Sequence, residues 1–224
     1  MTLAVREKGI ALVTGEVGTG KSTAVRAFIA SLDTNRHALL YLTLPINSPT
    51  ALYRQLLGTL NQPVPFGAAA QIAALRNALA ELIQSQRKTP VIVIDEAHLL
   101  PHTLIDPLRT LISAQLDSQS LAALVLMAPR RATFGQPELK RMLQLSTHAA
   151  FAQRITHRAH IEPLGLEATL AYIDHHLKVA GIHDSHTLFS DESGRSRGHA
   201  LKRIAEWTQG IPRKINQICI AACQ

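Results

Sequence analysis

The sequence has few of the features that mark membrane, secreted or disulfide-bonded proteins. It contains 2 cysteines, and Cys219 and Cys223 have the spacing of one helix face, so we expect no disulfide framework. No apolar run approaches the roughly 20 residues that a membrane-spanning helix needs. Residues 1–8 lack the apolar core of a signal peptide. We therefore expect a cytoplasmic protein that does not act in a membrane.

Aromatic residues and acidic residues are also scarce. Aromatics make up 4% of the chain, which argues against base stacking on single strands. The 16 acidic residues are outnumbered by 23 Lys and Arg, and the net charge of +7 favours anionic partners. The 11 histidines form no acid–histidine set with zinc spacing, and neither cysteine has C-x-x-C spacing, so neither residue type indicates a metal site. The hydrophobic fraction of 46% excludes global disorder.

Short apolar runs alternate with helical patterns until Pro163, and only helical patterns follow it. We expect strands at 9–14, 38–44, 90–95, 121–127 and 159–161. Helices are expected at 21–32, 49–60, 68–86, 104–116 and 138–145, then at 166–180, 199–208 and 212–223. Alternation of this kind indicates a parallel sheet covered on both faces. The sequence therefore predicts an α/β domain over 1–164 and a small helical domain over 165–224.

The first chemical motif matches G-x-x-x-x-G-K-[ST] between an expected strand and an expected helix. Its glycines let successive backbone N–H groups turn toward one anion at a helix N-terminus. Lys21 can reach the β- and γ-phosphates, and the Ser22 hydroxyl can bind Mg²⁺. The expected nucleotide-binding residues are Gly15, Glu16, Val17, Gly18, Thr19, Gly20, Lys21, Ser22 and Thr23.

The second motif is an apolar strand, VIVI, that ends in Asp95 and Glu96. In P-loop enzymes an acid at a strand tip holds the magnesium. Asp95 is assigned that role, with Ser22 as the second metal ligand. Glu96 is then placed to polarise the attacking water, so Glu96 and Lys21 are the expected catalytic residues of an ATPase. A solvated acidic turn is the alternative explanation of this motif.

GEVGTGKST, VIVIDEAH, the Gln-Arg-Ile at 153–155 and the GIPRKIN at 210–216 together resemble the AAA+ ATPase superfamily. The similarity is greatest to the branch that holds the general secretion pathway A-component and the target-selecting ATPases of transposons. The resemblance implies a five-stranded parallel P-loop NTPase domain followed by a helical lid. It also implies homo-oligomeric rings or filaments with ATP between neighbouring subunits.

Further site residues come from this resemblance alone. Arg154 resembles the arginine finger that reaches the γ-phosphate of the next subunit, and Arg158 is the rival candidate. Arg213 resembles the lid arginine that senses the same phosphate, and Gln136 resembles the polar sensor at the end of the fourth strand. A surface charge or a structural salt bridge is the alternative role of each arginine.

The chain departs from the family pattern in three places. Only residues 1–14 precede the phosphate loop, whereas family members usually have a longer segment that helps to enclose the adenine. Residues 128–134 intervene before the segment that contains Gln136, and residues 193–199 look like an extra loop before a lid helix. Adenine recognition and hydrolysis are the properties that these departures affect.

Positive charge is concentrated in two segments, 130–158 and 195–214, each with six basic residues and one acidic residue. This pattern favours contact with a DNA or RNA phosphate backbone, although solvated helix faces would give the same pattern. We expect a mobile-element accessory ATPase that acts with double-stranded DNA and a transposase. The alternatives are a secretion-pathway assembly ATPase, whose family members usually continue into a membrane segment, and a nucleotide-binding scaffold with little hydrolysis.

Overall fold

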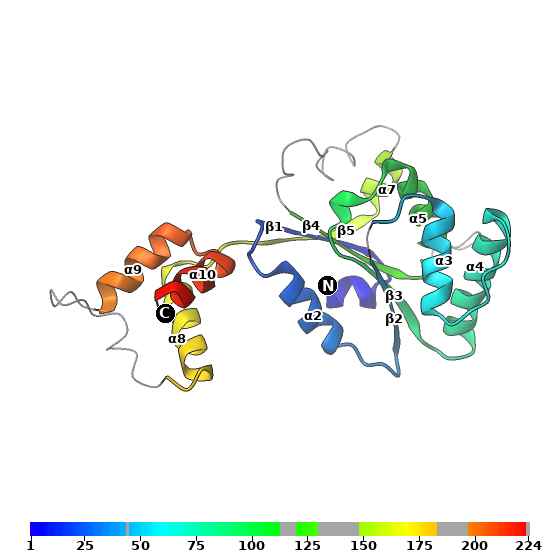
Figure 1. Ribbon diagram of the computed structural model, residues 1–224. Coiled ribbons are helices and arrows are strands. Elements are labelled where there is room, and N and C mark those ends of the chain that lie inside the picture. The colour runs from blue at the N-terminus through cyan, green and yellow to red at the C-terminus, as the bar shows by residue number, and fades with distance from the viewer. Residues whose placement is uncertain (44, 113–119, 130–147, 183–196, 223–224) are drawn as a thin grey trace. The chain divides into compact units, whose positions relative to one another are not determined.

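The computed structural model describes residues 1–43, 45–112, 120–129, 148–182 and 197–222, and the chain divides into two compact units. The first unit contains Met1–Thr14 and Ser22–His160. The second contains Gly15–Lys21 and Ile161–Gln224, so the phosphate loop is grouped with the C-terminal helices. Each unit has its own apolar core. Figure 1 shows the helices and strands of both units.

The first unit is built on a five-stranded sheet with the strand order β2-β3-β4-β1-β5. The strands are β1 (Ile10–Gly15), β2 (His37–Leu42), β3 (Thr89–Ile94), β4 (Ala123–Pro129) and β5 (Ile155–Ile161). In the parallel register of β2, β3 and β4, Ile94 lies opposite Leu42 on one side and Leu126 on the other. The carboxyl ends of these three strands therefore lie at one edge of the sheet, and the acidic pair follows directly after β3. The predicted α/β fold class is confirmed.

Alternate strand residues supply the two buried faces of this sheet. Ile92 and Ile94 belong to a large core cluster with helix residues such as Leu56, Leu79 and Leu108, whereas Val91 and Val93 are buried outside that cluster. The helices are α1 (Thr2–Arg6), α2 (Lys21–Ala30), α3 (Pro49–Thr59), α4 (Ala68–Gln84), α5 (Ile105–Ile112) and α7 (Ala149–Gln153), with the 3₁₀ turns η1 (Ala97–Leu99) and η2 (His102–Leu104). Figure 1 shows α1 and α2 on one side of the sheet and α3 and α4 on the other. A strand buried on both faces explains the continuous apolar run of β3.

The second unit contains the helices α8 (Leu166–Val179), α9 (Arg197–Thr208) and α10 (Pro212–Ala222). Ile173, Leu177, Leu201 and Ile215 form its core. Between α9 and α10 the chain turns at Gly210, whose φ is +67° and whose carbonyl accepts a hydrogen bond from the Leu164 N–H at 2.9 Å. A Cβ at Gly210 would overlap the Leu164 carbonyl, so this turn requires glycine.

Several elements differ from their predicted extents. The helices α1 and α7 were not predicted, and β5 begins at Ile155 instead of at residue 159. The structure divides the chain at His160–Ile161, near the expected boundary at 164–165. The predicted helix at 138–145 lies outside the described residues. Among the helices that the structure describes, none is both long and apolar enough to cross a membrane.

Candidate functional site

The phosphate loop follows β1 and leads into α2, as the motif requires. Gly15 is buried at the end of β1, and a Cβ there would lie 2.8 Å from the Ile161 carbonyl oxygen. Within the loop, both the N–H and the hydroxyl of Thr19 donate to the Glu16 carbonyl, at 3.3 and 2.8 Å. Val17 is 60% exposed at the tip of the loop. The loop is therefore folded back on itself, with an exposed apolar tip.

Lys21 lies inside this loop. Its side chain is 7% exposed, and its ammonium Nζ donates to the carbonyl oxygens of Gly15 at 3.1 Å and Glu16 at 2.8 Å. Hydrogen bonds to these two carbonyls offset part of the free-energy cost of burying the ammonium. As a cation, the ammonium forms stronger hydrogen bonds to anions than to carbonyls. The ammonium is thus held in the loop that the motif assigns to phosphate. A phosphate oxygen would be a stronger acceptor for it than either carbonyl.

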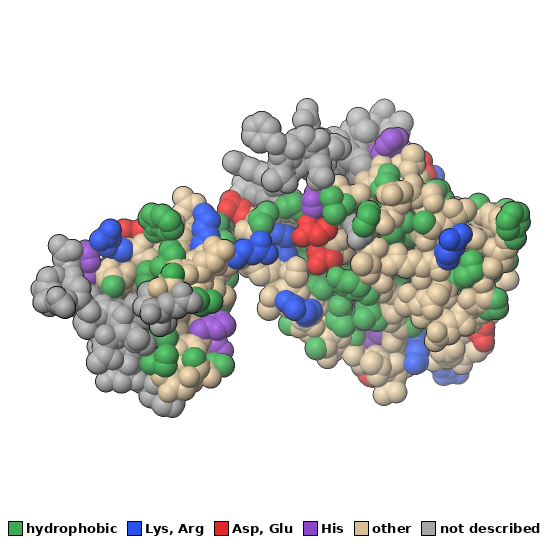
Figure 2. Space-filling model, viewed as in Figure 1, with side chains coloured by type: hydrophobic (Ala, Val, Ile, Leu, Met, Phe, Trp, Pro, Cys, Tyr) green, Lys and Arg blue, Asp and Glu red, His purple; other side chains and the backbone are tan. Residues whose placement is uncertain are grey.

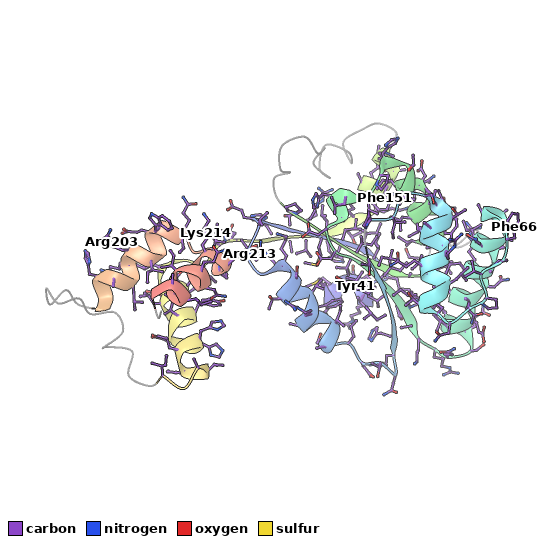
Figure 3. All side chains as sticks on the ribbon, in the orientation of Figure 1. Tyr41, Phe66, Phe151, Arg203, Arg213 and Lys214 are labelled. Carbon is purple, nitrogen blue, oxygen red and sulfur yellow. The ribbon has the colours of Figure 1, made fainter. Side chains whose placement is uncertain are left out.

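Arg213 lies in the first turn of α10, beside the loop. Its backbone N–H donates to the Gly18 carbonyl at 3.2 Å, and its side chain is exposed (Figure 3). Gly18 has a φ of +89°, and a Cβ there would lie 2.9 Å from the Arg213 Cβ and 3.0 Å from the Ile211 Cγ2. Both the backbone conformation and the close packing of α10 therefore demand glycine at this position. The resemblance assigned Arg213 to the nucleotide site, and within the second unit it contacts the phosphate loop.

Ser22 and Asp95, the two expected metal ligands, are in contact within the first unit. The Ser22 hydroxyl donates to Asp95 Oδ2 at 3.1 Å, and the Glu96 N–H donates to Asp95 Oδ1 at 2.8 Å. A hydroxyl and a carboxylate are hard oxygen donors, and Mg²⁺ usually takes only one or two protein ligands beside water and phosphate. Among the described residues no group of three or more His, Cys, Asp or Glu forms a metal site. The Ser22–Asp95 pair fits Mg²⁺ with water and phosphate as its remaining ligands.

Glu96 has a left-handed backbone conformation, with φ 53° and ψ 38°, at the start of η1. For a residue with a Cβ this conformation costs about 1–2 kcal/mol. The Leu99 N–H donates to the Glu96 carbonyl at 2.8 Å, and Ala97 is completely buried, so the turn is fixed on the carboxyl side of the strained residue. The Glu96 side chain is 49% exposed, and its Oε2 lies 3.2 Å from His98 Nδ1. Strain of this kind is typical of functional sites.

Tyr41, at the end of β2, is a residue of this region that the motifs did not indicate. It is 38% exposed and lies opposite Val93, two residues before Asp95. Figure 3 labels its side chain. Burial raises the pKa of the Tyr41 hydroxyl above its ordinary value, the negative charge of Asp95 raises it further, and Arg26 opposes the shift. Because Tyr41 stands near the carboxyl end of β2, the sequence could have placed it at the same edge of the sheet as the acids. Only the strand order makes β2 the neighbour of β3.

The remaining candidate residues are Arg154, Arg158, Thr23 and Gln136. Arg154 is exposed between α7 and β5, and its N–H donates to the Phe151 carbonyl at 3.0 Å. It therefore precedes the amino end of β5, whereas the phosphate loop follows the carboxyl end of β1. The rival, Arg158, is exposed within β5, and Thr23 is exposed on α2. Gln136 lies outside the described residues.

The chain is similar to a known protein family and to a named relative. The family model described as AAA domain matches residues 5–143. General secretion pathway protein A of Aeromonas hydrophila is 34% identical over 219 residues, which are 94% of this chain and 36% of that protein. The chain thus spans little more than a third of that relative.

Two solved structures have the same fold. Cdc6p from Pyrobaculum aerophilum has a TM-score of 0.59 at 16% identity over 95% of this chain and 60% of that one. The Aeropyrum pernix ORC2 protein, solved as ADPNP–ADP complexes, has a TM-score of 0.60 at 11% identity over 99% of this chain and 66% of that one. At these identities the likeness concerns the fold.

Proposed function

The chain belongs to the AAA domain family of P-loop ATPases, and from this premise we propose that it binds Mg-ATP and hydrolyses it. The observation that supports this most is the contact of Ser22 Oγ with Asp95 Oδ2 at 3.1 Å. It joins the last residue of the phosphate-binding motif to the first acid after β3, which P-loop enzymes use together to hold Mg²⁺. Bound Mg²⁺ would neutralise part of the charge on the β- and γ-phosphates.

In this proposal each residue of the site has a separate role. The loop N–H groups and the Lys21 ammonium bind the phosphates, and Lys21 exchanges its two carbonyl acceptors for phosphate oxygens. The Glu96 carboxylate accepts a hydrogen bond from the attacking water and orients it in line with the γ-phosphate. Arg213 senses the γ-phosphate, and its backbone contact with Gly18 supports that role.

We further propose that the active form is an oligomer in which Arg154 of one copy completes the site of the next. The position of Arg154 before the amino end of β5 supports a role outside its own nucleotide site. A guanidinium at the γ-phosphate stabilises charge that develops during transfer, so hydrolysis would depend on assembly.

Nucleotide titration tests the binding step. Lys21→Ala removes the cation from the loop and should abolish Mg-ATP binding. Lys88→Ala is the matched control, because Lys88 precedes the amino end of β3 and should leave the dissociation constant unchanged. Asp95→Asn should bind ATP but lose the dependence of its affinity on Mg²⁺. An unchanged affinity of Lys21→Ala would contradict the proposed site.

For the biological role, we propose an accessory ATPase that acts on double-stranded DNA with a transposase. Basic side chains on α9 and α10 support the DNA contact, and two of them are labelled in Figure 3. These side chains are Lys202, Arg203 and Lys214; all are exposed, and none forms an ion pair with another described residue. Figure 2 shows Lys and Arg side chains on the surface of the helical unit.

A second candidate role, assembly of a secretion apparatus, is favoured by the relative named General secretion pathway protein A. DNA titration separates the two roles. The first predicts that duplex DNA stimulates hydrolysis, that added salt removes the stimulation through counterion competition, and that Lys202→Ala with Arg203→Ala weakens it. A rate of hydrolysis that duplex DNA does not change at low salt favours the second role.

A further inference from the structure

His98 lies against the carboxylate that the proposed function assigns to the attacking water. His98 Nδ1 and Glu96 Oε2 are 3.2 Å apart, and the histidine side chain is only 11% exposed. The Nδ1 atom is buried, and it makes no aligned hydrogen bond with any residue that the structure describes. The Glu96 carboxylate is therefore an acceptor within reach of this nitrogen, and rotation of the exposed glutamate side chain would align the pair.

Backbone hydrogen bonds fix the turn that contains both residues. The Glu96 N–H is bonded to Asp95 Oδ1 at 2.8 Å, the Leu99 N–H to the Glu96 carbonyl at 2.8 Å, and the Leu100 N–H to the Ala97 carbonyl at 3.2 Å. Ala97 and Leu100 are buried on either side of His98. Because the turn is fixed, the orientation of the Glu96 carboxylate depends mainly on its own side-chain torsions. A half-exposed glutamate has several rotamers, of which few direct an oxygen at one given water.

We propose that His98 is a positioning residue for Glu96. In this proposal, which rests on the proposed function, the neutral imidazole donates its Nδ1–H to Glu96 Oε2. This hydrogen bond holds one carboxylate oxygen, selects the rotamer, and leaves Oε1 to accept the hydrogen bond from the attacking water. The nearly buried ring is rigid, so it imposes its orientation on the exposed carboxylate rather than the reverse.

The test compares His98→Asn with His98→Leu. The Asn side-chain N–H lies at the same number of bonds from Cβ as the Nδ1–H of histidine and can replace that donor, whereas Leu fills similar space without one. Loss of a hydrogen bond to a charged group changes a rate constant or an equilibrium constant by roughly ten- to hundredfold. We expect His98→Leu to lose that factor in kcat, with KM and the dissociation constant for Mg-ATP unchanged, and His98→Asn to stay within about threefold of the wild type.

Two kinetic results would overturn the proposal. A kcat for His98→Leu that equals or exceeds the wild-type value would mean that His98 does not help Glu96. A kcat for His98→Asn as low as that of His98→Leu would mean that the ring is needed for packing and not for its donor.

A spectroscopic measurement tests the contact without any turnover. In ¹⁵N-histidine-labelled protein, the His98 ring signals, assigned by their loss in His98→Asn, should show the Nδ1–H tautomer. In Glu96→Ala this tautomer loses its acceptor, and the signals should move toward the Nε2–H form. Identical ring signals with and without Glu96 would overturn the contact. A wild-type chain that binds ATP without hydrolysing it would instead count against the proposed function.

Discussion

The backbone N–H of Arg213 donates a hydrogen bond to the carbonyl oxygen of Gly18 at 3.2 Å, and this joins α10 to the phosphate loop. The loop and the C-terminal helices form one compact unit, and a Cβ at Gly18 would lie 2.9 Å from the Arg213 Cβ on α10. The sequence motif predicts that the loop glycines bind phosphate, and the structure adds a packing role for one of them, Gly18.

Gly18→Ala should weaken both folding and nucleotide binding. The left-handed backbone alone costs about 1–2 kcal/mol, and the new Cβ would displace Arg213 and Ile211. Urea unfolding measures the loss of stability, and titration measures the loss of Mg-ATP affinity. The control is Gly58→Ala in α3, where a Cβ has no neighbour within 4 Å. That change should stabilise the chain by about 0.5–1 kcal/mol. Wild-type stability in Gly18→Ala would refute the tight contact with α10.

The ionisation of Tyr41 should report the charge of Asp95. Since burial is the larger cause of the raised pKa and Asp95 the next, Asp95→Asn should lower the pKa of Tyr41 without returning it to 10.0. Ultraviolet titration measures this, with Tyr41→Phe to assign the signal. Tyr53, whose pKa burial also raises and Arg76 lowers, should not respond and serves as the internal control. An equal pKa of Tyr41 in the wild type and in Asp95→Asn would contradict the arrangement of the two side chains.

The same shift has a consequence for stability at high pH. The folded chain holds the Tyr41 proton more tightly than the unfolded chain does, so this contribution to stability is complete below pH 10.0 and is lost as the pH rises through the folded-state pKa. As the pH rises above 10.0, Tyr41→Phe should therefore lose less stability than the wild type. Denaturant unfolding at several alkaline pH values measures the difference.

Arg154→Ala should reduce hydrolysis by roughly a thousandfold if the arginine acts as a finger. Mixing Arg154→Ala with Lys21→Ala should restore part of the activity, because one copy supplies an intact phosphate loop and the other an intact arginine. Arg158→Ala is the matched control and should hydrolyse normally. A mixture that co-assembles and remains inactive would show that Arg154 does not act between subunits.

The motifs and the core strands could be predicted because their signals are local. β3 is buried on both faces and is followed directly by Asp95, so a continuous apolar run ending in acids was sufficient to find it. β5 was predicted too short, since Thr156, His157 and Arg158 give this edge strand a polar sequence. The helix α1 was missed because its 5 residues are too few for a helical period.

Contacts between side chains were harder to predict than the elements. The position of Tyr41 near Asp95 depends on the pairing of β2 with β3, which no local pattern specifies. The approach of His98 to Glu96 depends on the left-handed turn at Glu96, a conformation that a residue other than glycine rarely adopts. The phosphate loop was predicted as part of the first domain because the motif contains no information on the packing of Gly18 against α10.

Phosphate release by the wild type and by Glu96→Gln, each at saturating Mg-ATP, tests the central claim most directly. Gln keeps the size and polarity of Glu96 but cannot act as a base. The account predicts equal dissociation constants for Mg-ATP and a release rate at least about a hundredfold lower in Glu96→Gln. Equal rates of phosphate release in the two proteins would contradict it.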